Sequence, residues 1–533
     1  MTQIGEAIAA LFGMDEPKKK IKKEKLKIRF SLFFDGTLNN RTNIEEREQF
    51  EMGTTTKPYK ENGDGGSNSY DNGRTNIAIM EPHVPIKKDQ KSETGYDYVF
   101  KIYIEGQGTF NRESDSGLGY SMGAGDSGVF SRARQGIDKA LAELREYLRK
   151  YPPEEFEIEK IDVDVFGFSR GAATARHSIF LVTDKYWEQS LPLDARIRYL
   201  GYEEITDKNI EVKFAGVYDT VVSVNASQYS YWSDNKLNQR AIDRATKSIH
   251  LAAAEEHRID FPLHTIKSAK TKGTGKEYYL PGVHSDVGGS YNLANEKLLD
   301  KGVENSTIKT VITAGSYNKM KAEKASLIKQ GVFTEEQLVI EVTSRGGRGG
   351  VPLEGKLVEV RKLKGKEYMR SSSEVERIIN DGYTTRLVED RDWLISQGWY
   401  KKDEIRIEIT GYDEAFQAYG NLIVNRRNIK SAYSNIPLKV MAKFARENKI
   451  EINPKLEDKA NIILNKEPDL LRLESRINSY IGSVGNNSKP EDWLNDKGIK
   501  HIRHDHLHMS CKMAIGYNPR FKKGKRLRYY YEG

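Results

Sequence analysis

Cysteine is nearly absent from this sequence, with Cys511 the single one among 533 residues. One thiol excludes an internal disulfide framework. No run of about 18 apolar residues occurs, which excludes a hydrophobic transmembrane helix. Charge of one sign is not in marked excess either, because 85 lysines and arginines stand against 77 aspartates and glutamates. This mild balance does not by itself favour a nucleic-acid binder.

The N-terminal residues also lack the pattern of a secretory signal. Residues 4–12 are largely apolar but contain Glu6, and no basic segment precedes them. We therefore expect no signal peptide and synthesis in the cytoplasm. The basic run Lys18–Lys25 could bind a membrane surface, but such runs are more often solvated linkers, which we favour.

Apolar runs that alternate or turn fully apolar predict the strands of a sheet. They occur at residues 26–34, 98–104, 161–166, 210–218 and 278–280. Helical patterns lie between them, at 137–148 and over about 238–257, and a long helix with a proline break is expected from about 413. Alternating strands and helices predict an α/β fold with a mostly parallel sheet flanked by helices.

The alternation fails between about Leu293 and Thr410, where lysine and glutamate are dense and 345–350 is a glycine-rich loop. Small exposed strands are expected at 356–362 and 404–409. A chain of this length exceeds one typical core. We therefore divide it into an N-terminal amphipathic and basic segment (1–25), an α/β core (26–292), an inserted cap or partner-binding module (293–410), and a helical and C-terminal segment that completes the core (411–533).

The most informative stretch is the turn Gly167-Phe168-Ser169-Arg170-Gly171, a G-x-S-x-G pattern. A strand precedes it and an alanine-rich helix follows, which is the context of a nucleophile elbow. The two glycines allow strand and helix to pass closely, and the serine hydroxyl is exposed on the turn. The backbone N–H of Arg170, at the positive end of the helix, would face a developing oxyanion.

A serine nucleophile needs a base, and the base needs an orienting acid. Asp219 follows the strand at 210–218, and His284 lies in a glycine-rich loop after the strand at 278–280. The order Ser, Asp, His is that of α/β-hydrolases. Asp286 competes as the acid, but its nearness to His284 in sequence leaves poor geometry for that role.

A second strand-end carboxylate, Asp35, follows the first strand. Its loop could supply the second oxyanion N–H, from Gly36 or Thr37, while Asp35 fixes the shape of the loop.

Two weaker motifs are interpreted as structural. Residues 123–128 match G-x-G-x-x-G, but no strand runs directly into them, so we expect a loop near the site mouth and no nucleotide cofactor. The segment His504–His508 has three histidines at alternate positions, and His501 precedes it. No CxxC or HExxH pattern accompanies them, so we expect a structural strand and no metal. His508 remains a rival to His284 as the base.

Five motifs in order resemble the type VI secretion lipase effectors of the first class, an α/β-hydrolase family. They are residues 33–40, 167–172, 216–221, 255–258 and 281–291, with a thinner likeness at 433–441. Two positions depart from the family pattern, Tyr218 for a usual tryptophan and Val222 for a frequent glycine. The resemblance implies the triad Ser169, Asp219 and His284.

The resemblance further implies a phospholipase that is delivered into the periplasm of a rival cell, with membrane phospholipid as substrate. A secretion-apparatus carrier and an immunity protein are its implied partners, and no nucleic acid is expected. Three alternatives remain: a soluble esterase or other serine acyl hydrolase, an inactive hydrolase-fold binding module, and a nucleic-acid binder that uses the patches at 18–25 and 522–528.

Overall fold

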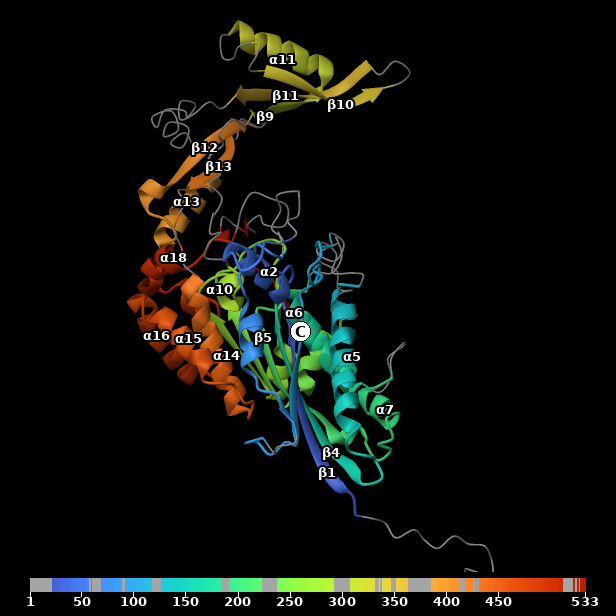
Figure 1. Cartoon of the computed structure of the whole chain (residues 1–533). Coiled ribbons are helices and arrows are strands. Elements are labelled where there is room, and N and C mark those ends of the chain that lie inside the picture. The colour runs from blue at the N-terminus through green and yellow to red at the C-terminus, as the bar shows by residue number, and fades with distance from the viewer. Residues whose placement is uncertain are drawn as a thin grey trace, which may run out of the picture.

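The computed structural model shows a central sheet with an outlying group of strands (Figure 1). It describes residues 22–56, 59, 69–88, 92–116, 126–184, 191–222, 237–291, 307–330, 335, 338–346, 351–362, 385–412, 418–424, 427, 429, 431–510, 521–522, 525–526 and 528–533.

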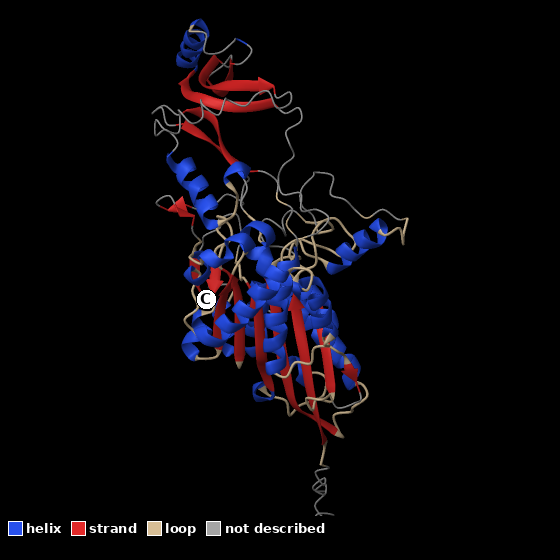
Figure 2. Cartoon of the chain, turned by 90° about the vertical axis from the view of Figure 1, so that its left-hand side faces the viewer, coloured by secondary structure: helices blue, strands red, loops and turns tan. Residues whose placement is uncertain are grey.

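The central sheet has seven strands in the order β2-β3-β1-β4-β5-β6-β8, and every pairing except β2 with β3 is parallel. The strands are β1 (Glu24–Phe34), β2 (Lys87–Lys88), β3 (Tyr98–Ile104), β4 (Phe156–Phe168), β5 (Ile210–Tyr218), β6 (Lys247–Ala253) and β8 (Gly275–Leu280). This topology confirms the predicted α/β class. Figure 2 shows the sheet with helices around it.

Helices cover both faces of the sheet because alternate residues of each strand point to opposite sides. In β4, Val163 and Val165 join the core on one side with α5 and α6, whereas Phe166 and Phe168 join the core on the other side with α14. In Figure 1, α5 and α7 lie on one side of the sheet and α14 to α16 on the other. Buried strands of this kind are apolar on both faces.

The helices of the core and of the C-terminal part are α2 (Arg41–Glu51), α3 (Asn76–Met80), η1 (Glu81–His83), α5 (Val129–Leu148), α6 (Arg170–Thr183), α7 (Leu193–Arg198), η2 (Asp207–Asn209), η3 (Gln239–Arg244), α9 (Lys267–Lys272), α10 (His284–Gly288), η7 (Ser431–Ser434), α14 (Asn435–Glu447), α15 (Lys455–Leu464), α16 (Pro468–Val484), α17 (Glu491–Leu494), η8 (Lys497–Ile499) and α18 (Lys500–His506). Within the described residues, no helix is long and apolar enough to cross a membrane.

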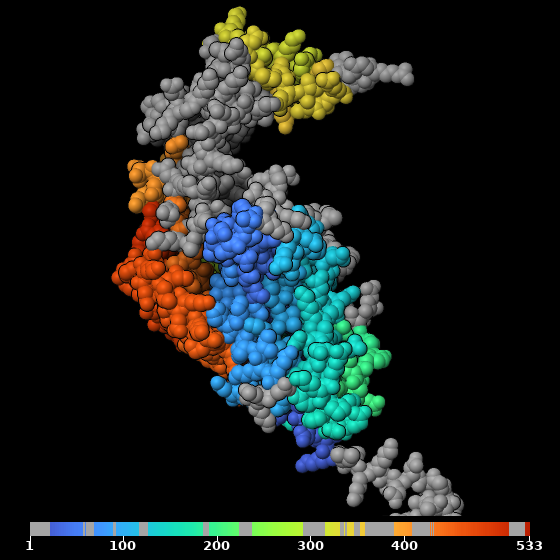
Figure 3. All heavy atoms as spheres, viewed as in Figure 1, coloured from blue at the N-terminus to red at the C-terminus, as the bar shows by residue number. Residues whose placement is uncertain are grey.

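A separate group of strands lies beyond the end of the sheet at which α2 and α10 lie (Figures 1 and 3). It contains a three-stranded antiparallel sheet, a two-stranded hairpin and flanking helices. Its elements are β9 (Thr307–Ser316), α11 (Tyr317–Lys329), β10 (Leu338–Gly346), β11 (Val351–Lys362), α13 (Thr385–Gln397), η6 (Lys402–Glu404), β12 (Ile405–Tyr412) and β13 (Ala418–Val424). The small strands expected at 356–362 and 404–409 are confirmed as β11 and β12.

The C-terminal residues return to the core. The short strands β14 (Phe521–Lys522) and β15 (Lys525–Arg526) pair with each other, and β16 (Tyr530–Glu532) pairs in parallel with β7 (Leu263–Thr265). Figure 2 marks the C-terminus beside the sheet. This return brings the last residues of the chain close to the ends of β5 and β6.

Three secondary-structure predictions are wrong. Residues 238–257 form η3 and the central strand β6, because their apolar residues are buried on both faces between β5 and β8. The helix expected from about 413 is absent at 418–424, where β13 pairs with β12, and α14 begins only at Asn435 with Pro437 in its first turn. The strand expected at His504–His508 is instead the end of α18 followed by extended residues.

Several predictions concern residues outside the described ranges. They are the apolar stretch 4–12, the first half of the basic run 18–25, the glycine-rich motif at 123–128 apart from its last three residues, the loop at 347–350, and Cys511.

Candidate active site

Ser169 lies on a sharp turn between β4 and α6, as the elbow prediction requires. Its backbone has φ 58° and ψ −127°, a conformation that is strained for any residue with a side chain. The Ser169 N–H donates to the Tyr218 carbonyl at 3.1 Å, and the Ser169 carbonyl accepts from Ala172 and Ala173 in the first turn of α6. The serine hydroxyl does not cap the helix. The surrounding chain therefore holds Ser169 on a strained turn, and the residue is 6% exposed, more buried than the sequence predicted.

The two glycines of the turn are required by close backbone contacts. A Cβ at Gly167 would lie 2.4 Å from the carbonyl oxygen of Gly171, and a Cβ at Gly171 would lie 2.3 Å from that of Asp35. These neighbours are backbone atoms that cannot rotate away. The pattern therefore allows α6 to pack directly against the ends of β4 and β1.

We expect Gly171→Ala to lower the free energy of unfolding by about 1–3 kcal/mol, the usual cost of overpacking. It should also reduce turnover, since relief of the clash moves α6 away from β1. Chemical denaturation and turnover of the same preparation measure both effects. Gly273→Ala is a useful comparison, because a Cβ there meets nothing within 4 Å and its cost comes only from a backbone φ of 82°. Equal turnover of Gly171→Ala and wild type would contradict this account.

Asp219 directly follows β5 and is fully buried, with φ 39°. Its Oδ2 accepts from His284 Nδ1 at 2.5 Å, and its Oδ1 accepts from the Ala253 N–H at 2.8 Å. Burial alone would raise the pKa of this carboxyl. The charge of Arg528 and hydrogen bonds from His284 and Arg528 outweigh burial and hold the pKa well below the ordinary value. Asp219 is therefore a carboxylate that orients the imidazole.

His284 begins the short helix α10, where a loop was predicted, and it is buried. Its ring packs against Phe168, the residue before Ser169, with ring centroids 4.5 Å apart, and edge-on against Phe261 at 5.0 Å. Because Nδ1 donates to Asp219, Nε2 is left as the basic nitrogen. The contact with Phe168 places this ring next to the elbow.

Burial lowers the pKa of His284, and the hydrogen bond and charge of Asp219 offset this effect only in part. The neutral imidazole is the form that acts as a base. It therefore persists to a pH below the ordinary histidine value of about 6.5.

Paired charges hold the backbone around His284. Glu256 Oε2 accepts the His284 N–H at 3.2 Å and also pairs with Arg258 at 3.0 Å. Glu255 accepts the Gly282 N–H at 2.7 Å and pairs with buried Arg503. Both glutamates belong to the motif at 255–258. The motif thus fixes the backbone that leads into α10 and so positions His284.

The loop after β1 supplies one clear candidate for the oxyanion hole besides Arg170. The Gly36 N–H donates to Asp35 Oδ1 at 2.7 Å, which engages it within its own turn. The Thr37 N–H has no backbone acceptor among the described residues, and Thr37 Oγ1 accepts from Arg170 Nε at 2.6 Å. This bond ties the loop to the first residue of α6. The Thr37 N–H is therefore a better candidate than the Gly36 N–H to form the oxyanion hole together with the Arg170 N–H.

Asp35 is buried and fixes the loop through three hydrogen bonds. It accepts from the Gly36 N–H, from Thr75 Oγ1 at 2.6 Å and from the Tyr103 hydroxyl at 2.6 Å. Burial raises the pKa of this carboxyl to about 6. These contacts suit the shaping role that was expected of Asp35.

Asp286 and His508 pair with each other and not with His284. Asp286 accepts His508 Nδ1 at 2.6 Å and the His508 N–H at 3.1 Å, and its Oδ2 also accepts the Val283 N–H. The Tyr291 ring stacks on His508 at 3.6 Å. This pair links the C-terminal segment to α10. Sequence analysis rejected Asp286 as the acid because it is close to His284 in sequence. It did not identify His508, 222 residues away, as the partner of Asp286.

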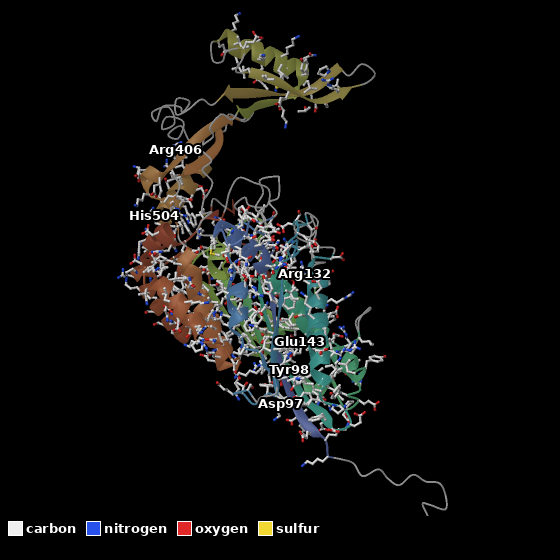
Figure 4. The ribbon with its side chains drawn as sticks, in the orientation of Figure 1. Asp97, Tyr98, Arg132, Glu143, Arg406 and His504 are labelled. Atoms are coloured by element: carbon white, nitrogen blue, oxygen red, sulfur yellow. The ribbon has the colours of Figure 1, made fainter. Side chains whose placement is uncertain are left out.

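The other C-terminal histidines point to different elements. His504 Nε2 contacts Glu404 at 2.9 Å, and Figure 4 shows His504 near Arg406, below the β12–β13 hairpin. His506 and His508 are buried, whereas His501 is exposed. No group of three or more metal-ligating side chains gathers in the part of the chain that the structure describes.

One residue of the site was missed by sequence analysis. Arg528 donates to both carboxylate oxygens of Asp219, at 2.6 and 2.7 Å, from a buried position near the C-terminus. It lies 309 residues from Asp219, in a basic stretch that showed only positive charge. No local pattern distinguishes it.

We expect Asp219→Asn to reduce turnover by about 10⁴-fold, as the same change does in a serine protease. An amide cannot hold the imidazole tautomer or stabilise the imidazolium. Asp286→Asn is the matched control and should lose much less turnover, since Asp286 contacts His508. Turnover of both variants on one ester substrate decides between the two acids. A larger loss for Asp286→Asn would overturn the choice of Asp219.

Comparisons with known proteins give a family match over part of the chain. Residues 183–312, which include Asp219 and His284, match the model described as "T6SS, Phospholipase effector Tle1-like, catalytic domain". No curated protein matches the chain.

Three solved structures are among those similar to this chain. The Tle1 effector bound to the VgrG spike of the type 6 secretion system is 19% identical with a TM-score of 0.47, covering 92% of this chain and 85% of its own. An uncharacterised protein from Pseudomonas aeruginosa is 18% identical with a TM-score of 0.33, over 88% and 66%. An esterase from Thermogutta terrifontis is 11% identical with a TM-score of 0.22, over 60% and 88%.

The family match covers in full three of the five motifs on which the resemblance rests, 216–221, 255–258 and 281–291. It agrees with the predicted hydrolase chemistry. The chain is a hydrolase of the α/β class, and its residues 183–312 are similar to the catalytic domain of Tle1-like phospholipase effectors of type VI secretion.

Proposed function

We propose that this protein is a serine-dependent phospholipase that hydrolyses the acyl esters of glycerophospholipids. Ser169 is the nucleophile, His284 the base and Asp219 the residue that orients it. The observation that carries the proposal is the strained elbow at Ser169 beside the buried His284–Asp219 pair. Strain of this kind persists where the surrounding structure enforces it, and it is frequent at catalytic sites.

The positions of these residues support a reaction through an acyl group on Ser169. His284 Nε2 accepts the Ser169 proton as Oγ attacks the ester carbonyl, and the Arg170 and Thr37 N–H groups stabilise the oxyanion. The imidazolium donates this proton to the leaving alcohol, which leaves an acyl group on Ser169. A water molecule then gives its proton to His284, attacks the acyl group and releases the fatty acid, and Ser169 regains its proton.

The family match favours phospholipid over a soluble ester as substrate. On the same basis we propose that the protein is an antibacterial effector of type VI secretion that acts in the periplasm of a target cell. A secretion-apparatus carrier would transport it, and an immunity protein would protect the producing cell.

We propose that the strands β9 to β13 form an accessory module, which a simple esterase would lack. They lie beyond the end of the sheet at which the parallel strands β1, β4 and β5 finish, which is the end that carries the site (Figures 1 and 2). We propose that 293–410 is a cap or partner-binding module inserted in the hydrolase domain, and that β13 belongs to it as well because β13 pairs with β12.

The test is incubation of the purified chain with vesicles of defined phosphatidylethanolamine and phosphatidylglycerol, followed by mass spectrometry of the products. Release of fatty acid with matching lysophospholipid supports the proposal. A short-chain water-soluble ester runs in parallel. Hydrolysis of that ester without any vesicle hydrolysis would assign a soluble esterase, and hydrolysis of neither would assign an inactive binding module.

A further inference from the structure

Arg528 makes a two-pronged contact with the buried Asp219. Its two terminal nitrogens donate to Oδ1 and Oδ2 at 2.6 and 2.7 Å, and Nε donates to the Phe261 carbonyl at 2.8 Å. The guanidinium also donates to the Ala253 carbonyl at 3.2 Å. Planar paired contacts of this kind fix the orientation of a carboxylate. Asp219 is therefore held by the guanidinium at both oxygens and by the imidazole at Oδ2.

The end of the chain places this arginine. Tyr530–Glu532 pair in parallel with Leu263–Thr265, and the Leu263 N–H donates to the Tyr529 carbonyl at 2.8 Å. The Ser268 N–H donates to the Gly533 carbonyl at 2.9 Å. These backbone bonds anchor both the residues after Arg528 and the chain end. Arg528 thus joins the site, and the backbone bonds of residues 529–533 hold it there.

The charges around the His284–Asp219 pair give Arg528 an electrostatic effect as well. Without Arg528, the pair in its active state would carry one buried negative charge and would take up a proton readily. With Arg528, the three groups are neutral in the active state and gain a net positive charge on protonation. Like charges nearby disfavour the protonated base. The arginine therefore opposes protonation of His284.

Other charged and titratable groups face this cluster. Glu256 is paired with Arg258, and both lie near His284. The hydroxyls of Tyr279 and Tyr530 lie near Arg528, and burial raises the pKa of Tyr530 to about 12, so it stays neutral. Arg528 is the cation that contacts Asp219 directly.

We infer that Arg528 is a positioning residue of the triad, which orients Asp219 toward His284 and keeps the imidazole neutral to lower pH than Asp219 alone would allow. This inference rests on the proposed triad. It assigns to Arg528, which precedes β16, a role in catalysis through Asp219 without contact with the substrate.

The test compares Arg528→Gln and Arg528→Lys with wild type across pH 4 to 9. Two readouts are used, kcat/KM on one ester and the rate at which a fluorophosphonate labels Ser169. We expect Arg528→Gln to move the acid limb of both profiles up by about one pH unit, the lower end of the shift that a neighbouring charge produces. Arg528→Lys should keep the acid limb, because the charge remains. Its kcat should fall with KM unchanged, because the two-pronged contact is lost.

Arg132→Met is the matched control. Arg132 is also a buried arginine, but it lies on α5 and pairs with Glu105 instead of Asp219 (Figure 4). It should lose stability with no movement of the acid limb. An unmoved limb in Arg528→Gln, or an equal movement in Arg132→Met, would overturn the inference. If Arg528→Gln does not fold, Arg528→Lys decides, because wild-type kcat in that variant excludes a positioning role. Absence of Ser169 labelling in the wild type would instead contradict the proposed function.

Discussion

Ser169→Ala is expected to lower turnover by about 10⁶-fold, the loss seen when the nucleophile of a serine hydrolase is removed. A small residual rate should remain, because the oxyanion donors and the binding surface still act on the ester. Turnover on phospholipid vesicles and on a soluble ester should fall together, since both reactions need the same hydroxyl.

The fold should tolerate this change. The hydroxyl does not cap α6, and alanine meets the same backbone strain as serine at φ 58°. We expect the free energy of unfolding to change by no more than about 1 kcal/mol, the typical effect of a point substitution. Chemical denaturation of the variant and loss of fluorophosphonate labelling form the control pair. Wild-type turnover in Ser169→Ala would show that the elbow is not the catalytic site.

His284→Ala should cause a loss of similar size, about 10⁶-fold, because the imidazole that accepts the Ser169 proton is removed. The pH profile supplies a second readout. Since burial lowers the pKa of His284, wild-type activity should persist below pH 6.5 and fall only at lower pH. That acid limb should be missing from the residual activity of the variant.

His508 is the control for this experiment, because it also pairs with a buried aspartate. His508→Ala should lower the free energy of unfolding by about 1–3 kcal/mol, the usual cost of leaving a buried partner unsatisfied. His508→Asn, which keeps a donor for Asp286, should recover part of that loss. Both should retain the wild-type acid limb. Loss of turnover in His508→Ala together with wild-type turnover in His284→Ala would identify His508, and not His284, as the base.

The parts of the site that sequence could predict are those whose signals are local. The elbow at Ser169 requires glycines within a few residues of the serine, and Gly167 and Gly171 are visible in the sequence. Asp219 and His284 follow apolar strands, and parallel strands end at one edge of a sheet, so their proximity was predictable. Sequence located the second oxyanion donor in the loop after β1 but could not decide between Gly36 and Thr37. That choice depends on which of the two N–H groups donates to Asp35.

The features that sequence missed depend on contacts between distant segments. Arg528 reaches Asp219 because β16 pairs with β7, and no sequence pattern near Arg528 predicts that pairing. Asp286 was judged against His284 alone, although its partner His508 lies far along the chain. The strand β6 was mistaken for a helix because a strand buried on both faces has no alternating pattern.

The most direct test of the central claim is detection of the acyl group on the enzyme. The purified protein is mixed with a p-nitrophenyl ester of a long-chain fatty acid, quenched with acid during turnover, digested and analysed by mass spectrometry. The account predicts one acyl group on the peptide that contains Ser169, and its disappearance in Ser169→Ala. Turnover accompanied by an acyl group on a different residue, or by an unchanged adduct in Ser169→Ala, would contradict it.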